Sequence, residues 1–438
     1  MLPERYAALL PETAAATPRG HLAIGGCDVV ELAATHGTPL YVYDEVTIRG
    51  RARAYREALK SAYPARSLVC YAAKAYCAPW LLKVIAEEAL GLDVVSGGEL
   101  FMALHSGFPI ERVYFHGNNK SDAELRQAVD AGVSRIVVDN LDEIDMLERT
   151  CDQQEVLLRV APSVEAHTHA HILTGALDTK FGLSIETGAA EQAARRILQS
   201  KRLRLVGLHA HIGSQIFELE PYRQTLQRTF DLAARLRDEA GFRLREISPG
   251  GGYGVRYSSA EDEPIPPAQA ARAVADAVCD AAAQHGFSDL PALTIEPGRS
   301  IVAPSAVAVY RVGSIKHIEG VRTYVAMDGG MADNIRPTAY GARYTPLLAN
   351  RVLDEADALV AVAGRYCESG DVLVKDASLP MPRVGDLIGV PASGAYQLSM
   401  ASNYNMVPRP AVVVVSDGQA RLVRRRETYE DLLSAERF

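Results

Sequence analysis

From Leu68 onward the sequence alternates between two patterns, and this alternation limits the fold more than any other feature. Short runs rich in β-branched residues have strand character, and stretches of helical periodicity separate most of them. The strand-like runs are residues 68–71, 92–95, 113–116, 135–138, 156–160, 204–211, 244–248 and 292–296. The helical stretches are residues 81–89, 98–106, 122–131, 141–150, 187–200, 221–240 and 267–285. Eight strands that alternate with helices over about 230 residues predict a parallel (β/α)8 barrel of the TIM type, in the α/β class. A doubly wound open sheet is the alternative, because strand number does not prove closure.

The pattern changes after Arg299. Strand-like runs then follow one another with few helices between them, and the turn Ser416-Asp-Gly-Gln419 predicts a hairpin. These runs are residues 307–315, 322–327, 358–362, 387–390, 411–415 and 420–423. We therefore expect a second, mainly antiparallel β domain. The predicted division is an N-terminal segment 1–45 that joins the β domain, a barrel of residues 46–302, and a C-terminal β domain of residues 303–438.

Composition excludes several classes of protein. Hydrophobic residues make up 48% of the chain and charged residues 23%, as in ordinary globular proteins. The net charge of −8 argues against a nucleic-acid or anionic membrane partner. No apolar run is long enough to cross a bilayer, and the first residues lack the features of a secretory signal. The six cysteines are scattered without C-x-x-C spacing, which disfavours zinc or a disulfide framework and favours the cytoplasm.

The first barrel strand runs into Lys74, within Tyr71-Ala-Ala-Lys74. Proteins of the α/β class keep their chemistry at the carboxyl ends of such strands. A lysine in this place is suited to form a Schiff base with a carbonyl group. On spacing alone, however, a lysine that only reaches solvent is the better interpretation, so the other strand ends have to decide.

Other predicted strands also end in polar or glycine-rich residues. These are Asp93, the pair His209 and His211, Gly213-Ser214-Gln215, Pro249-Gly250-Gly251-Gly252-Tyr253-Gly254, and Glu296-Pro297-Gly298-Arg299. Glycine-rich turns expose backbone N–H groups to anions, and the loops after strands seven and eight are the usual phosphate site of this barrel. A glycine loop alone is a weak signal, but its combination with Lys74 and Glu296 is much stronger.

This combination suits pyridoxal 5'-phosphate. The cofactor needs a lysine for its aldehyde, N–H donors with a serine or an arginine for its phosphate, and a partner for its ring nitrogen. Glu296 is the candidate for the ring nitrogen, and His211 for stacking on the ring. Structural interpretations stay equally open at this point: an ion pair between Glu296 and Arg299, and hydrogen-bonded core histidines at His209 and His211.

Two further motifs allow a structural interpretation as well as a functional one. His167-Thr-His-Ala-His171 resembles a metal cluster, but no acid or cysteine stands near it, so we expect no metal and a solvated or substrate-edge loop. Cys367, beside Glu368, is either a small buried hydrophobe or an acid that delivers a proton to a carbanion.

Several linked motifs resemble one known family. They are Tyr71-Ala-Ala-Lys74, His211-Ile-Gly-Ser-Gln215, the glycines of residues 250–254, Glu296-Pro-Gly-Arg299, Cys367-Glu-Ser-Gly-Asp371 and Gly394-Ala-Tyr396. Over nearly its whole length the chain resembles the fold-type III pyridoxal-phosphate decarboxylases. Gly117-Asn-Asn-Lys120 and Asp178-Thr-Lys-Phe-Gly182 are typical of the branch that acts on diaminopimelate.

The resemblance implies roles for single residues. Lys74 would bind the cofactor covalently, and Cys367 would donate the proton. The other cofactor-binding positions implied are Asp93, His211, Ser214, Gly251, Gly252, Glu296, Gly298, Arg299 and Tyr396. The substrate-binding positions implied are Arg299, Arg336, Tyr340, Glu368 and Tyr396. In the family, Cys367 and Glu368 reach the active site from the partner subunit, which implies a homodimer with shared active sites.

The expected reaction is decarboxylation of meso-2,6-diaminopimelate to L-lysine and CO2, the last step of lysine biosynthesis. Arg336 suits the distal carboxylate of this small amino acid, because its guanidinium can bind a carboxylate with two hydrogen bonds. The alternatives are a decarboxylase of ornithine, lysine or a carrier-bound acid on the same scaffold, a non-catalytic paralogue, and a racemase. One departure from the family is that its usual Tyr-His pair appears here as Arg343-Tyr344.

Overall fold

The computed structural model describes residues 2–164, 179–261 and 263–437, which form two compact units. The barrel unit comprises Arg51–Gly254 and Pro264–Ser300. The β unit comprises Met1–Gly50, Val255–Glu263 and Ile301–Phe438. The domain boundaries expected from the sequence stay predictions; the observed units change a few residues away from them, and the short stretch 255–263 belongs to the β unit.

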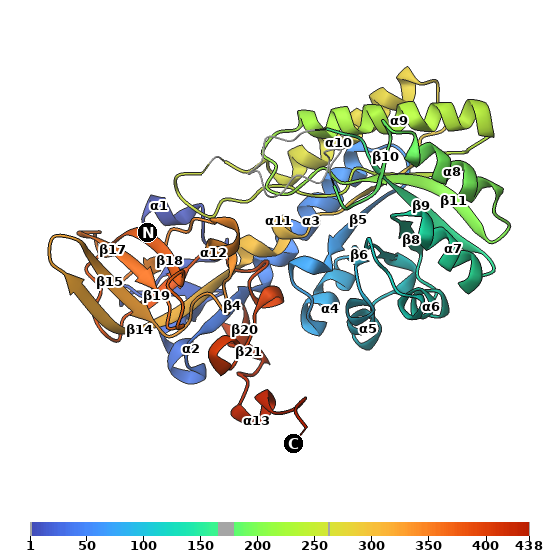
Figure 1. The fold of residues 1–438 in the computed structure, drawn as a ribbon. Helices are drawn as coiled ribbons and strands as arrows, with labels where there is room; N and C mark the ends of the chain where they lie inside the picture. Colours follow the sequence, from blue (N-terminus) through green and yellow to red (C-terminus); the bar gives the residue numbers. More distant parts are fainter. Residues whose placement is uncertain (1, 165–178, 262, 438) are drawn as a thin grey trace. The chain divides into compact units, whose positions relative to one another are not determined.

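The barrel unit contains eight parallel strands in a closed ring (Figure 1). In spatial order they are β5 (Ser67–Ala72), β6 (Gly91–Val94), β7 (Val113–Phe115), β8 (Arg135–Val138), β9 (Gln154–Ala161), β11 (Leu203–Ala210), β12 (Glu246–Ser248) and β13 (Ala292–Ile295). The pairings of β8 with β9 and of β13 with β5 close the ring, and the short β10 (Leu183–Ser184) pairs with the end of β9. The barrel prediction is confirmed, and the open sheet is wrong.

Helices surround the barrel strands (Figure 1). They are α3 (Glu45–Ala62), α4 (Pro79–Glu87), α5 (Gly97–His105), α6 (Asp122–Ala131), α7 (Leu141–Thr150), α8 (Ala189–Gln199), α9 (Glu220–Ala240), α10 (Pro267–Gln284) and α11 (Arg299–Val302). Local sequence sets their ends. The Ser121 side chain and Glu124 form a capping box at the start of α6, and Gly132 in the left-handed conformation ends this helix.

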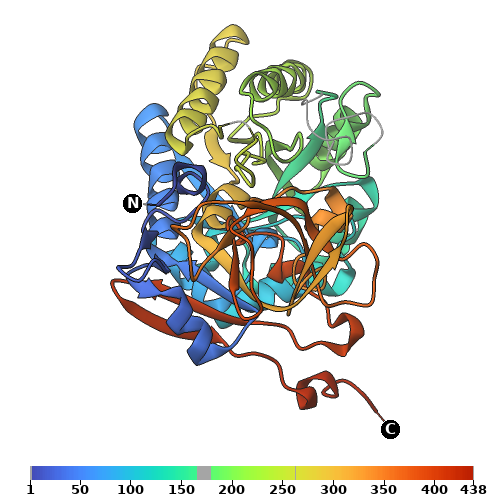
Figure 2. The same cartoon turned by 90° about the vertical axis from the view of Figure 1, so that its left-hand side faces the viewer.

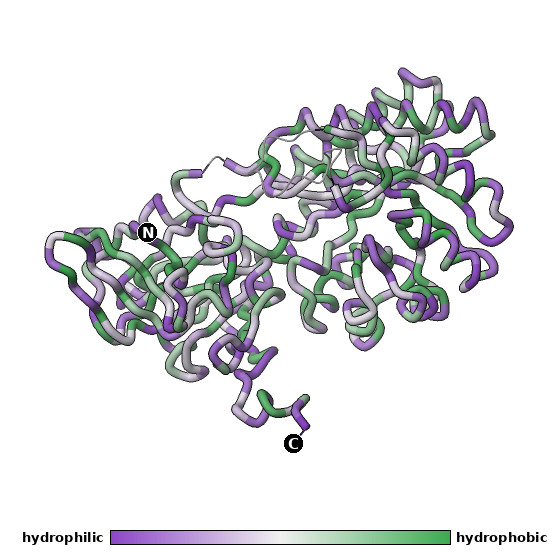
Figure 3. The backbone as a smooth tube through the Cα atoms, viewed as in Figure 1, coloured by the Kyte–Doolittle hydropathy of each residue, from purple (hydrophilic) through white to green (hydrophobic). Residues whose placement is uncertain are grey.

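Part of the barrel interior is an apolar cluster. Cys70, Tyr114, Val137, Leu157 and Val206 form one buried cluster from different strands. Figure 3 shows the barrel strands as largely hydrophobic, whereas hydrophilic stretches recur along the surrounding helices. This contrast is the pattern of a parallel sheet that is covered on its outer face.

The β unit is built mainly from antiparallel strands, as predicted. A three-stranded sheet contains β1 (Ala15–Ala16), β2 (Leu22–Ile24) and β3 (Cys27–Asp28). The larger sheet contains β4 (Leu40–Asp44), β14 (Ala306–Ile318), β15 (Arg322–Met327), β16 (Leu347–Leu348), β17 (Ala358–Ala363), β18 (Val372–Leu379), β19 (Leu387–Val390), β20 (Ala411–Ser416) and β21 (Gln419–Arg424). Short helices are α1 (Glu4–Ala7), α2 (Val29–His36), α12 (Arg336–Tyr340) and α13 (Tyr429–Leu432).

The N-terminal strand β4 lies inside the larger sheet. It pairs antiparallel with β14 and parallel with β20, so strands from the N-terminal and C-terminal parts of the sequence are neighbours in this sheet (Figure 2). β18 was not predicted, because Lys375 and Asp376 interrupt its apolar pattern and its outward side chains are exposed.

No helix in the described part of the chain has the length and apolar character that a membrane span requires.

A buried ion pair holds the turn after β7. Lys120 is 3% exposed, and its ammonium donates to Gly117 O (2.8 Å), Val137 O (2.9 Å) and Glu143 Oε1 (2.6 Å). All three donors of the ammonium are therefore satisfied.

We expect Lys120→Met to lower the free energy of unfolding by about 3–5 kcal/mol, because it leaves the Glu143 charge buried without a partner. Urea unfolding measures this change. The double variant Lys120→Met/Glu143→Leu should recover a large part of the loss. The exposed Lys83→Met serves as control and should change stability by no more than about 0.5 kcal/mol. A Lys120→Met variant as stable as this control would contradict the expectation.

Candidate active site

The polar residues singled out on the barrel strands gather at the carboxyl ends of these strands. Lys74 lies in the 3-10 turn η1 (Ala73–Ala75) directly after β5, and its side chain is exposed. Burial raises the pKa of Asp93 on β6 well above its ordinary value, Glu296 raises it further, and the Lys74 charge opposes the shift. Burial lowers the pKa of His211, and the Lys74 charge lowers it further. Lys74 therefore lies within electrostatic range of two other predicted site residues.

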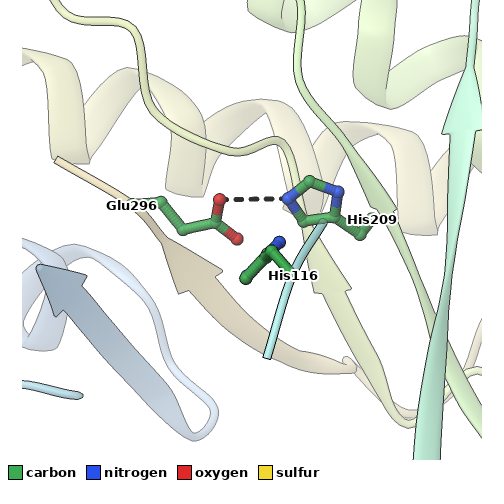
Figure 4. A group of neighbouring side chains, drawn as sticks. All are labelled: His116, His209 and Glu296. Carbon is green, nitrogen blue, oxygen red and sulfur yellow. Dashed lines mark hydrogen bonds and ion pairs between the residues drawn. The ribbon is translucent and has the colours of Figure 1, made fainter. Parts of the chain in front are cut away.

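Glu296 is held by hydrogen bonds to both of its carboxylate oxygens. Oε2 accepts from His209 Nε2 at 3.0 Å (Figure 4), and Oε1 accepts from Ser248 Oγ at 2.7 Å. Burial alone would raise the pKa of Glu296, but His209 and His116, together with these hydrogen bonds, bring it below its ordinary value. Glu296 is therefore a buried carboxylate that stays ionised.

His116 completes this buried group. Its ring lies edge-on to the ring of His209, with centroids 4.9 Å apart, and its Nε2 is 3.5 Å from Asp93 Oδ1. Burial lowers the pKa of His116 well below its ordinary value, so the ring is neutral near pH 7. One ring nitrogen each of His116 and His209 and one carboxylate oxygen of Glu296 lie within 4.8 Å of one another (Figure 4). His209 and Ser248 thus fix the position of the Glu296 carboxylate, and His116 lies beside them.

The glycine loop after β12 approaches its neighbours too closely for any side chain. A Cβ on Gly251 would lie 1.9 Å from the Glu296 carbonyl oxygen, and one on Gly252 would lie 2.3 Å from Gly213 O. The Gly251 N–H donates to His211 Nδ1 at 3.3 Å, and this bond orients the imidazole. Gly251 therefore has a structural reason to be glycine, apart from any phosphate.

Two side chains next to this loop suit an anion. Arg299, at the start of α11, donates from Nη2 to Ser214 Oγ at 2.8 Å. Gly298, just before it, passes the β5 end closely, since a Cβ there would lie 2.9 Å from the Ala72 side chain. A guanidinium, a hydroxyl and glycine N–H groups are the donors that a phosphate requires.

The β unit carries a second polar group, centred on Arg336. Arg336 is 6% exposed; its guanidinium donates to the Tyr344 hydroxyl at 2.7 Å and lies 4.0 Å from the centroid of the Tyr257 ring. The Tyr344 hydroxyl accepts from Gln397 Nε2 at 3.0 Å, and Gln397 Oε1 accepts from Tyr41 at 2.8 Å. Among the residues that the structure describes, no carboxylate forms an ion pair with Arg336. A buried cation is thus held in place by neutral groups.

Cys367 and Glu368 are exposed on a turn of the β unit, so the interpretation of Cys367 as a buried hydrophobe is wrong. The Cys367 N–H donates to Asn405 Oδ1 at 2.8 Å. The Asp371 carboxylate accepts from the N–H groups of Tyr366 (2.9 Å) and Met331 (2.7 Å), which fixes the base of the turn.

Tyr340, Tyr396 and the histidine motif 167–171 are the remaining predicted residues. Tyr340, at the end of α12, is 43% exposed, and Tyr396 adopts the left-handed backbone conformation with φ of 56°. Both lie in the β unit, and their roles stay predictions. The motif 167–171 lies outside the described residues.

Sequence reasoning missed several residues of these two groups. They are His116, Ser248, Tyr257, Tyr344 and Gln397. His116 follows a barrel strand directly, as Lys74 does, and this position was a usable signal. Tyr344 was visible only as a departure from the family pattern, and its bond to Arg336 required the fold.

The barrel residues fit pyridoxal phosphate. Lys74 offers an amine, Glu296 an ionised carboxylate for a protonated ring nitrogen, and His211 a partly exposed ring whose orientation is fixed by Gly251. Ser214 and Arg299 form a donor pair for the phosphate. Asp93 Oδ1 and His116 Nε2, which face each other at 3.5 Å without a hydrogen bond, lie at the same end of the barrel.

Comparison with known proteins leads to the same family. The family described as "Pyridoxal-dependent decarboxylase, pyridoxal binding domain" matches residues 46–303. A diaminopimelate decarboxylase of Bacillus subtilis (strain 168) is 47% identical over 94% of each chain. The chain belongs to the diaminopimelate decarboxylase family. A diaminopimelate decarboxylase of Mycobacterium tuberculosis (strain H37Rv) is 44% identical over 95% of each chain. The solved diaminopimelate decarboxylase of M. jannaschii in complex with L-lysine shares 33% identity over 98% of each chain, with a TM-score of 0.90.

Membership of the diaminopimelate decarboxylase family confirms the expected enzyme class and cofactor: the chain is a pyridoxal-phosphate-dependent carboxy-lyase.

We expect His209→Phe to weaken cofactor binding and to lower kcat, each by about 10- to 100-fold, because a hydrogen bond to a charged group contributes about 1.5–3 kcal/mol. Loss of this donor also lets burial raise the pKa of Glu296. Equilibrium dialysis of the cofactor and steady-state kinetics measure the two effects. The exposed His105→Phe is the control. Wild-type affinity and turnover in His209→Phe would show that His209 does not support Glu296.

A pH effect on stability is expected from Asp333, which is 3% exposed and accepts from Tyr310 at 2.6 Å. Burial raises the pKa of Asp333 to about 6. Between about pH 4 and 6 the folded chain holds a proton that the unfolded chain releases, so this residue's contribution to stability falls as pH rises. The total is about 3 kcal/mol for a shift of about two pKa units. We therefore expect the unfolding free energy of the wild type minus that of Asp333→Asn to fall over this window; a constant difference in urea unfolding would be contrary to it.

Proposed function

We propose that the chain decarboxylates meso-2,6-diaminopimelate at its α-carbon to give L-lysine and CO2, the last step of lysine biosynthesis. Relatives named diaminopimelate decarboxylase at 43–47% identity support the reaction. The observation on the chain itself that carries the proposal is Arg336, a buried guanidinium for which the described residues supply no carboxylate partner. A substrate with a second carboxylate would supply it.

The barrel residues would hold the cofactor. Lys74 provides the amine for its aldehyde, Glu296 pairs with the ring nitrogen, and His211 covers the ring. The phosphate would be bound by Ser214 and Arg299, with N–H groups of the nearby glycines. When bound, pyridoxal phosphate withdraws electrons from the substrate α-carbon and so makes the loss of CO2 possible. The ionised Glu296 keeps the ring nitrogen protonated, which strengthens this withdrawal.

The β-unit residues would bind the substrate and deliver the proton. Arg336 binds the distal carboxylate, and the Tyr257 and Tyr344 rings keep the guanidinium oriented toward it. Ornithine and lysine carry a cation at the corresponding end, so the buried Arg336 disfavours both. Glu368, Tyr340 and Tyr396 are the further substrate-binding candidates, and Tyr396 is also a cofactor-binding candidate. Cys367 protonates the α-carbon after CO2 has left.

We also propose that the active enzyme is a homodimer in which Cys367 and Glu368 act in the partner's active site. Their exposure on a structured turn supports this arrangement. Mixing Lys74→Ala and Cys367→Ala chains tests it, because a mixed dimer then contains one site with both groups intact. Random mixing should restore about a quarter of wild-type activity. Two inactive variants that stay inactive after subunit exchange would contradict shared sites.

The cytoplasm is the proposed location, and the six cysteines, all of them free in the structure, agree with a reducing compartment.

Substrate comparison tests the reaction. The wild-type holoenzyme should turn over diaminopimelate far faster than ornithine or lysine. Arg336→Gln should lower kcat/KM for diaminopimelate by about 30-fold or more, since loss of a buried charge-assisted contact costs about 2–5 kcal/mol. The exposed Arg383→Gln, in the same unit, is the matched control. Negligible turnover of diaminopimelate, with good turnover of ornithine, lysine or a carrier-bound acid, would establish the alternative instead.

A further inference from the structure

The barrel unit has a polar cavity at the end opposite to Lys74. Its volume is about 430 Å³, and it lies at the amino-terminal ends of the strands. The lining residues are Arg66, Arg135, Glu155, Val206, Arg245, Glu246, Leu290 and Ala292. Nothing in the decarboxylation mechanism uses this end of the barrel.

Glu246 lines the cavity, and its charge is already neutralised. It is 3% exposed and accepts hydrogen bonds from Tyr114 (2.5 Å), Thr294 (3.1 Å) and Arg135 Nε (2.9 Å). These groups satisfy its charge from inside the barrel, so Glu246 has no need of a further cation.

The second carboxylate of the cavity is also occupied. Glu155 Oε2 lies 2.7 Å from Arg135 Nη1, and Glu155 Oε1 lies 3.5 Å from Arg204 Nη1. Arg135 thus bridges both acids of the lining, and Arg204 adds a cation beside them. Neither acid is available to the other two lining arginines.

Arg66 and Arg245 are the arginines that remain. Within the described part of the chain, neither guanidinium forms a hydrogen bond or an ion pair, and both side chains are exposed. Their backbones bracket β13: the Arg66 carbonyl accepts from Leu293 N at 2.9 Å, and the Arg245 carbonyl accepts from Ala292 N at 2.7 Å. The strands on either side of β13 are about 10 Å apart, so two arginine side chains can reach one ligand between them.

The cavity lining contains more arginines than carboxylates. Three arginines face two carboxylates in a protein whose net charge is −8. The ion pairs of Arg135 with Glu155 and Glu246 give Arg135 a structural role. This explanation does not extend to Arg66 and Arg245. Two neighbouring guanidiniums without a counter-charge repel each other, and a bound anion would remove this cost.

We propose that this cavity binds a small, multiply charged oxyanion, such as a phosphate group or a polycarboxylate, between Arg66 and Arg245. Arginine suits both ligands, because its planar fork matches their oxygen atoms. Leu290 and Ala292 supply an apolar wall beside the charged end. The site is distinct from the cofactor's phosphate site, which lies at the carboxyl ends of the same strands.

Calorimetric titration of the holoenzyme tests the proposal, with inorganic phosphate in one arm and citrate in the other. Bound pyridoxal phosphate keeps the cofactor's own phosphate site filled, and its visible absorbance reports any disturbance there. We expect saturable binding of one anion per chain, without a change in this absorbance. The affinity should weaken as NaCl is raised, because these guanidiniums are exposed.

Variants assign the binding to the cavity. Arg66→Gln/Arg245→Gln should weaken binding at least tenfold, and each single variant should weaken it less. Arg243→Gln is the matched control, since Arg243 lies next to this segment, outside the lining, and pairs with Asp289. Binding of phosphate alone or of citrate alone supports the proposal and identifies the ligand class. Absence of saturable binding in both arms, or equal affinity of the double variant and the wild type, would overturn it. Neither result would affect the proposed decarboxylation.

Discussion

The active end of the barrel depends on keeping one buried carboxylate ionised. Removing Glu296 from water favours its neutral form, and only the donors His209 and Ser248, with His116 close by, reverse this preference. The two donors and Glu296 come from three neighbouring strands, β11, β12 and the end of β13, so the arrangement exists only when these strands are paired in register. Fold and chemistry are therefore linked through the hydrogen bonds of a single side chain.

In the β unit the buried charge is a cation, that of Arg336. Here a cation is buried among tyrosines and a glutamine, and the hydroxyl network that reaches from Tyr344 through Gln397 to Tyr41 fixes its direction without neutralising it. Holding a charge with neutral groups keeps its full attraction for an anionic ligand. A carboxylate neighbour would have been a better partner for stability and a worse one for binding.

Much of this organisation could be predicted from the sequence, because local patterns report local structure. The bounds of α6 and α7 follow from apolar periodicity and from caps such as Ser121. The grouping of polar residues at strand ends follows from the rule that α/β proteins place their functional residues at the carboxyl ends of parallel strands. The network around Arg336 could not be predicted, since Tyr257 and Tyr344 are far apart along the chain and meet only through tertiary packing. β18 was missed for a similar reason, because pairing with β17 overrides its charged residues.

The position of β4 bears on how the protein is made. This strand lies between β14 and β20, yet it leaves the ribosome long before either of them. Residues 40 and 411 are paired, so at 5–20 residues per second the first waits roughly 20–70 s for the second. During that time the edge of β4 that faces β20 has no lasting partner, and an edge of this kind is open to pairing with other chains. The larger sheet is therefore completed around β4 only when synthesis is nearly finished.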